Sequence, residues 1–166
     1  ILVFAIPIGL GCAIYLSEWK VRDVKATFDG ELRRGSALHN FGTETFSDSA
    51  RVKADPGKHP KADEVPAMKL NFVLDFQTGV YDYNTMTSSF VWLAPRGKRP
   101  AGSLAKVSFS SQEWCGQVWH QLLFDDDSVR EVSHSYFDGE ADVQKELPYP
   151  EHALSEDALL FWARGL

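Results

Sequence analysis

Cysteine and recognisable metal-binding spacings are nearly absent from this sequence of 166 residues. Its two cysteines, Cys12 and Cys115, lie in very different contexts, so we do not expect a disulfide between them. None of the five histidines forms an HxxxH or HxH pair, and no twelve-residue EF-hand loop is present. The sequence therefore predicts no metal ion and no cofactor.

Basic residues are also in deficit. Lys and Arg number 17 against 23 Asp and Glu, which gives a net charge of -6. Nucleic-acid binding needs cations that displace phosphate counterions, so we expect no nucleic-acid partner. The 44% of apolar residues and the absence of low-complexity blocks exclude disorder. Aromatic residues make up 13%, and with the many Val, Thr and Ser residues they favour strands.

The first sixteen residues carry no charge. As a helix they would span about 24 Å, slightly short of a bilayer core, and we expect preceding residues to complete the span because the chain does not begin with Met. A lipoprotein signal with Cys12 as the lipidated residue and an ordinary buried element remain alternatives. Our interpretation is a membrane anchor over residues 1–19, followed by a single extracytoplasmic β domain over residues 20–166, which we expect in the periplasm. The anchor side chains are Ile1, Leu2, Phe4, Ile6, Ile8, Leu10, Ile14, Leu16 and Trp19.

The clearest strand pattern lies in residues 68–76, where apolar side chains alternate with mostly polar ones. Turn signals separate it from further predicted strands at 21–28, 31–46, 51–54, 81–93, 104–110, 113–124, 128–137 and 140–147. This succession predicts a mainly β fold, an antiparallel meander closed into a barrel or folded as a sandwich. One C-terminal helix is expected after Ser155 as its N-cap. Its predicted buried face is Leu159, Leu160, Trp162 and Ala163.

Several stretches resemble one bacterial protein family. They are GELRRGSAL (30–38), TETFS (43–47), RVKAD (51–55), KLNFVLDFQTGVYDYNTMTSSF (69–90), SSQEWCGQVWHQL (110–122) and HSYFDGEAD (134–142). In these blocks and their order the chain resembles the uncharacterised family often labelled "septum formation inhibitor", whose members extend past the position matching Leu166. The nucleotide pyrophosphatases that properly carry that name have a Ser-Pro-Arg-Arg motif, which is missing here. The resemblance implies a secreted or membrane-attached β protein and no particular activity.

Cys115 is the most conspicuous candidate for chemistry. A nucleophilic thiol needs a base such as His, but His120 lies five residues along the strand and therefore on the opposite face. His134 and His39 could approach only through the fold. The alternative is a small side chain packed beside Trp114 and Trp119.

The loop 95–103 contains three cations and no acid, and could contact lipid headgroups or an acidic partner. Acidic runs at 125–127 and 138–142 are better explained as hairpin turns than as calcium ligands. Candidate interaction residues are Arg96, Lys98, Arg99, Trp92, Trp114 and Cys115.

These features lead to three hypotheses on function. The first is a non-enzymatic accessory subunit of an integral-membrane protein complex, for which respiratory and photosynthetic assemblies are candidate hosts; its partners are membrane lipid and an integral-membrane protein. The second is a carrier of lipid or another hydrophobic ligand. The third is a thiol enzyme that uses Cys115.

Overall fold

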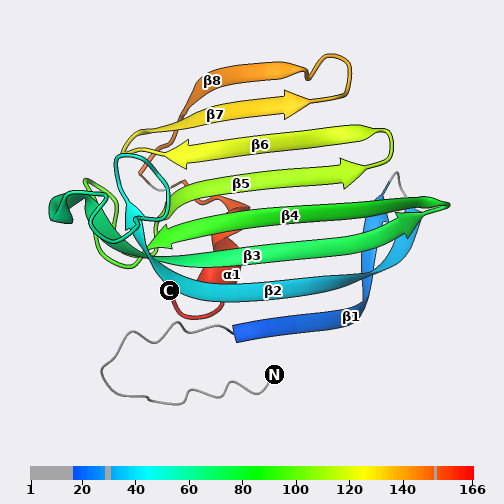
Figure 1. The fold of residues 1–166 in the computed structure, drawn as a ribbon, viewed down its shortest axis with the longest axis horizontal. Coiled ribbons are helices and arrows are strands. Elements are labelled where there is room, and N and C mark those ends of the chain that lie inside the picture. Colours follow the sequence, from blue (N-terminus) through cyan, green and yellow to red (C-terminus); the bar gives the residue numbers. More distant parts are fainter. Residues whose placement is uncertain (1–16, 29–30, 152) are drawn as a thin grey trace.

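The structure, a computed structural model, describes residues 17–28, 31–151 and 153–166. It is an eight-stranded antiparallel sheet in which every strand pairs with its neighbours in sequence (Figure 1). The strands are β1 (Ser17–Phe28), β2 (Glu31–Ser47), β3 (Glu64–Thr78), β4 (Tyr81–Trp92), β5 (Leu104–Glu113), β6 (Gly116–Phe124), β7 (Ser128–Ser135) and β8 (Asp142–Pro148). The predicted mainly β meander is confirmed.

Alternation along β3 divides the sheet into two faces. Leu70 is 2% exposed and lies opposite Phe41 on β2 and Ser89 on β4. Its neighbours Lys69 and Asn71 point to the other face, as period two requires. The register of the meander thus follows from the apolar pattern that the sequence shows.

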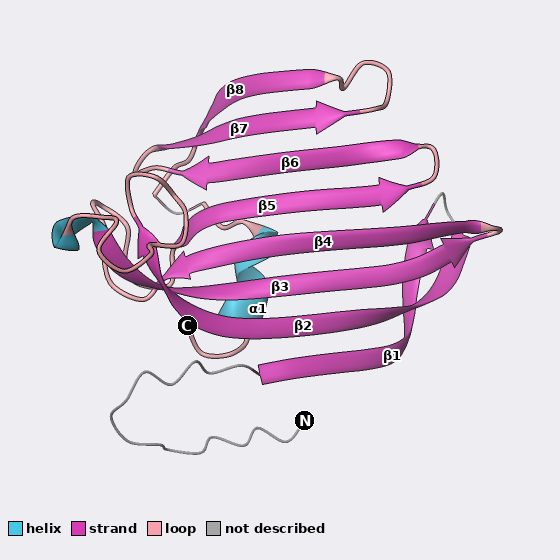
Figure 2. Cartoon of the chain, in the orientation of Figure 1, coloured by secondary structure: helices cyan, strands magenta, loops and turns pink. Residues whose placement is uncertain are grey.

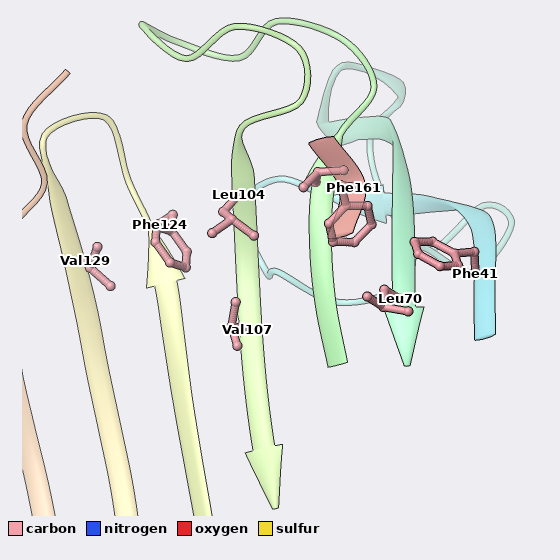
Figure 3. Packing of buried hydrophobic residues seen from close by; sticks show 8 residues of the cluster. Phe41, Leu70, Leu104, Val107, Phe124, Val129 and Phe161 are labelled. Carbon is pink, nitrogen blue, oxygen red and sulfur yellow. The ribbon is translucent and has the colours of Figure 1, made fainter. Parts of the chain in front are cut away.

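Neither a closed barrel nor a two-sheet sandwich forms, so that part of the fold prediction is wrong. The described strands make one open sheet, ordered from β1 to β8 without closure. Closure is unnecessary because the C-terminal segment covers the apolar face instead. Phe161 packs into a cluster that also contains Phe41, Leu70, Val91 and Leu104 (Figure 3).

The C-terminal helix is shorter than expected. A single turn of 3-10 helix, η2 (Glu156–Ala158), leads into α1 (Leu159–Trp162), which lies against one face of the sheet (Figure 2). Ser155 is the N-cap, as predicted, and its side-chain oxygen accepts the backbone N–H of Asp157. The predicted buried face is wrong: Phe161 is 1% exposed, whereas Leu159, Leu160 and Trp162 are exposed. One turn is too short for the 3.6-residue period to define a face.

Three predictions concern the N-terminal part of the chain. Residues 1–16 of the anchor predicted over residues 1–19 lie outside the described residues, so the anchor helix stays a prediction. Trp19 lies in β1 opposite His39, and the predicted boundary after residue 19 therefore falls inside this strand. The strand predicted at 51–54 is reduced to one isolated bridge between Phe46 and Lys53.

Among the helices that the structure describes, none has both the length and the apolar character to cross a bilayer. A further 3-10 turn, η1 (Lys61–Asp63), precedes β3.

Candidate docking surface

The basic loop at 95–103 is held by carboxylates and carbonyls of the same chain. Arg96 pairs with Asp48, and the Lys98 ammonium lies 2.6 Å from a carboxylate oxygen of Asp127, which raises the pKa of Lys98. Arg99 is only 8% exposed and donates to the Tyr149 carbonyl at 2.9 Å. Arg96 and Arg99 are therefore held within the fold, whereas the Lys98 side chain is 69% exposed and forms only a surface ion pair. These pairings weaken the prediction that the loop binds lipid or an acidic partner.

Arg51 organises the same end of the sheet, and sequence reasoning missed it. Its guanidinium donates to the carbonyls of Ala105 at 3.0 Å and Phe124 at 2.7 Å, and to a carboxylate oxygen of Asp125 at 3.1 Å. Burial lowers the pKa of Arg51, although Asp125 and Asp48 oppose that shift. A positive φ of 55° places the residue in the left-handed region. No sequence signal marks such a contact, because its acceptors are mostly backbone.

Trp92 belongs to the core rather than to an interface. It is 2% exposed and packs edge-on against Phe46, with ring centroids 5.6 Å apart, while Arg51 lies over its ring. Trp92 ends β4 and belongs to an apolar cluster with Phe46, Val65 and Phe90, which explains the burial. The burial of this ring speaks against the prediction that Trp92 contacts a partner.

The opposite end of the sheet exposes apolar side chains at three successive hairpin tips. The β3–β4, β5–β6 and β7–β8 turns lie at one end of the sheet, on the right in Figure 1. Their tips carry Val80, Trp114 and Tyr136, which are 73%, 71% and 69% exposed. We call this surface the aromatic end; it comprises Val80, Tyr81, Trp114, Tyr136 and Phe137.

Ring contacts order the aromatic end. Tyr81 and Trp114, from adjacent hairpins, meet edge to face with centroids 5.7 Å apart. Tyr136 and Phe137 make a similar edge contact at 5.9 Å. Edge-to-face pairs are favourable in themselves, so the rings are presented in defined orientations rather than as loose side chains.

An open hollow of about 640 Å³ adjoins these tips and lies between the β5–β6 and β7–β8 hairpins. Trp119, His134 and Tyr136 line it, and Trp119 stacks on His134 with centroids 5.7 Å apart. Gly116 makes room for Tyr136, because a Cβ at this position would lie 2.4 Å from the tyrosine ring. The rest of the lining combines polar side chains, among them Ser110, Ser135 and Gln117, with the apolar Val118 and Ala141.

Cys115 lies at the edge of the hollow and is exposed. Its backbone N–H donates to Glu113 Oε2 at 2.9 Å. Partial desolvation and the Glu113 carboxylate raise the pKa of the Cys115 thiol, which opposes formation of a thiolate. The nearby histidines have other partners: His120 lies 3.1 Å from Glu131, and His134 lies 2.6 Å from Asp142.

The acidic runs at 125–127 and 138–142 lie at hairpin turns, as predicted. Gly139, with a φ of 81°, follows Asp138 in the β7–β8 turn, while Asp125 and Asp127 lie at the β6–β7 turn. Within the described part of the chain, no three His, Cys, Asp or Glu side chains are arranged to hold a metal ion.

Sequence reasoning selected Trp114 and Cys115 but missed Val80, Tyr136 and Phe137. A signal for them exists: hairpin tips usually hold Gly, Asn, Asp or Pro, so large apolar residues there are unusual. Comparison of the chain with protein-family models, with curated proteins and with solved structures finds no match in any of the three. The resemblance to the family labelled "septum formation inhibitor" therefore stays a prediction, and a function must be argued from the geometry.

Proposed function

We propose that this chain is a non-enzymatic accessory subunit whose β domain docks on an integral-membrane protein complex through the aromatic end. The observation that carries the proposal is the gathering of exposed Val80, Trp114 and Tyr136 at three hairpin tips on the same end of the sheet. The apolar N-terminal segment confines the domain at the membrane, on its extracytoplasmic side. Respiratory and photosynthetic assemblies remain candidate hosts.

The aromatic end has the composition of a binding hot spot rather than of a structural turn. Scattered exposed apolar side chains are normal on a protein surface, but a contiguous group marks an interaction site. Trp and Tyr are the residues that most often dominate binding energy in protein interfaces. Each tip could be closed by Gly or Asn at no cost to the strands, so Trp114 and Tyr136 are not required by the fold itself.

Membrane confinement lowers the affinity that docking requires. A tethered domain meets its partner at an effective concentration on the order of 1 mM for short flexible linkers, so a modest contact area suffices. Three hairpin tips form a small surface, and a small surface is consistent with a subunit held in place by two attachments.

The two alternative functions receive less support. Phe161 packs against Phe41 in the cluster that also contains Leu70, on the apolar face where a carrier would hold its ligand. The raised pKa of the Cys115 thiol opposes nucleophilic catalysis at neutral pH. Docking uses the features that these alternatives leave unexplained, above all the exposed rings.

The test is co-migration of the full-length protein with its partner after mild detergent extraction of its own membrane. The variant Val80→Ser, Trp114→Ser, Tyr136→Ser should leave the complex and migrate alone. A matched control, Leu154→Ser, Leu159→Ser, Trp162→Ser, removes three exposed apolar side chains from the C-terminal segment and should stay in the complex. An unchanged unfolding midpoint shows that both variants fold.

Two results contradict the proposal. One is a hairpin variant that stays in the complex as fully as the wild-type chain. The other is a wild-type chain that migrates alone and monomeric under all mild conditions.

A further inference from the structure

We infer that the aromatic end receives a basic segment of the partner protein, with a Lys or Arg side chain seated in the hollow between Trp119 and Tyr136. The inference rests on the proposed function and specifies the chemistry of the partner. Its basis is the charge of the three hairpins and the rings that line the hollow.

The three hairpins are acidic without compensation in their own sequence. Residues 77–83, 112–118 and 134–142 contain no Lys and no Arg. Arg33 and Arg34 come from β2, which β3 and β4 separate from the strands around the hollow. The carboxylates of the three hairpins are Asp82, Glu113, Asp138, Glu140 and Asp142.

The other end of the sheet shows the contrast. There, Arg51, Arg96 and Lys98 each pair with a carboxylate of the same chain. Positive and negative groups are thus matched within the fold at one end, while the aromatic end presents an excess of negative charge. Complementary charge selects partners and accelerates their encounter, so this excess favours a basic surface.

The hollow offers rings to such a cation. Trp119 is 38% exposed and Tyr136 is 69% exposed, and both line the hollow. The faces of Trp and Tyr rings attract Lys and Arg, with Trp the strongest. This chain uses the same contact internally, where the Arg99 guanidinium lies 4.2 Å from the centre of the Tyr149 ring.

The β7–β8 hairpin places carboxylates next to the hollow in sequence. Glu140 and Asp142 flank Ala141, which lines the hollow. These carboxylates would attract a guanidinium or ammonium of the partner. An acidic protein or an anionic lipid surface would instead be repelled by the hairpin carboxylates.

The first experiment titrates the full-length protein, in mild detergent, with a peptide of alternating arginine and leucine by calorimetry. A citrulline counterpart keeps the shape and removes the charge, and a glutamate counterpart reverses it. The arginine peptide should bind about 10-fold more tightly than the citrulline peptide, and the glutamate peptide should not bind. Raising the salt concentration from about 0.05 M to about 0.5 M should weaken the binding of the arginine peptide.

Variants locate the binding. We expect two variants to lower the affinity for the arginine peptide about 10-fold each. They are Tyr136→Ala and the double variant Asp138→Lys, Glu140→Lys. The matched control Asp55→Lys, Glu151→Lys makes the same charge change at the other end and should leave binding within about twofold.

The inference is overturned by an arginine peptide that fails to bind, by equal binding of the citrulline peptide, or by variants without effect. Binding to phosphatidylcholine vesicles in place of the peptide would assign the aromatic end to lipid and also overturn it. If the serine variant of the hairpin tips leaves the complex but the Asp138→Lys, Glu140→Lys variant stays, the proposed docking function stands. The inference that the partner segment is basic then fails. If both variants stay, the proposed function fails as well.

Discussion

Replacing Phe161 by Ala should destabilise the domain more than any other single change in the C-terminal segment. The ring is 1% exposed and meets Phe41 edge to face, with centroids 5.8 Å apart. Removing roughly 150 Å² of buried apolar surface at about 25 cal/mol/Å² gives a loss near 4 kcal/mol, within the range of about 3–5 kcal/mol for buried Phe→Ala changes. We therefore expect the free energy of unfolding in urea to fall by about 4 kcal/mol.

The neighbouring residue provides the control. Trp162 is 72% exposed, so Trp162→Ala should change the free energy of unfolding by less than about 0.5 kcal/mol. If Trp162→Ala costs as much as Phe161→Ala, then the residue that seals the sheet has been misidentified. The packing argument would also be refuted by hydrogen exchange that shows β2 and β3 equally protected in the wild-type chain and in the Phe161→Ala variant.

Three further predictions concern charged groups and the thiol. Arg51→Met removes the donor shared by the Ala105 and Phe124 carbonyls and should lower the free energy of unfolding by about 3 kcal/mol, whereas Arg130→Met, at an exposed ion pair, should lower it by less than about 1 kcal/mol; equal losses would contradict the role of Arg51. The hydrogen bond from the Ser47 hydroxyl, with one from the Ser49 N–H, lowers the pKa of Asp63. The stabilising effect of the ionised Asp63 is therefore present above about pH 4 and is lost as the pH falls through its folded-state pKa. In urea titrations between pH 7 and pH 3, the free energy of unfolding should fall less steeply for Asp63→Asn than for the wild-type chain. Iodoacetamide should label Cys115 more slowly than a free cysteine at pH 7.5, and Glu113→Gln should accelerate labelling; a rapid reaction that plateaus at neutral pH would restore the thiol-enzyme hypothesis.

The strands were predictable because each carries its own pattern. Residues 68–76 alternate so regularly that the burial of Leu70 and the existence of β3 follow from period two alone. Turn residues such as Gly79, which has a φ of 63°, fixed where the strands reverse. Whether the sheet closes was not predictable, because closure depends on what covers the apolar face. That role belongs to Phe161, which is distant in sequence from the residues that it covers.

The candidate site was predictable only in part. Trp114 was selected because Trp is frequent in interfaces, and its exposure at a hairpin tip fits that reason. Trp92 was selected on the same ground, yet it is buried, because residue type does not distinguish a core ring from an exposed one. Arg96, Lys98 and Arg99 looked free in the sequence because their partners, Asp48, Asp127 and the Tyr149 carbonyl, come from other segments.

The meander also bears on how the chain acquires its structure. Every described strand pairs only with its sequence neighbours, so hairpins can form one after another as the polypeptide is synthesised or exported. The contact between Phe161 and Phe41 joins opposite ends of the domain and can form only when nearly all of it is present. Until that contact forms, the apolar face of the growing sheet is exposed to solvent. Nascent chains truncated before Phe161 should consequently depend on holdase chaperones far more than the longer chain does.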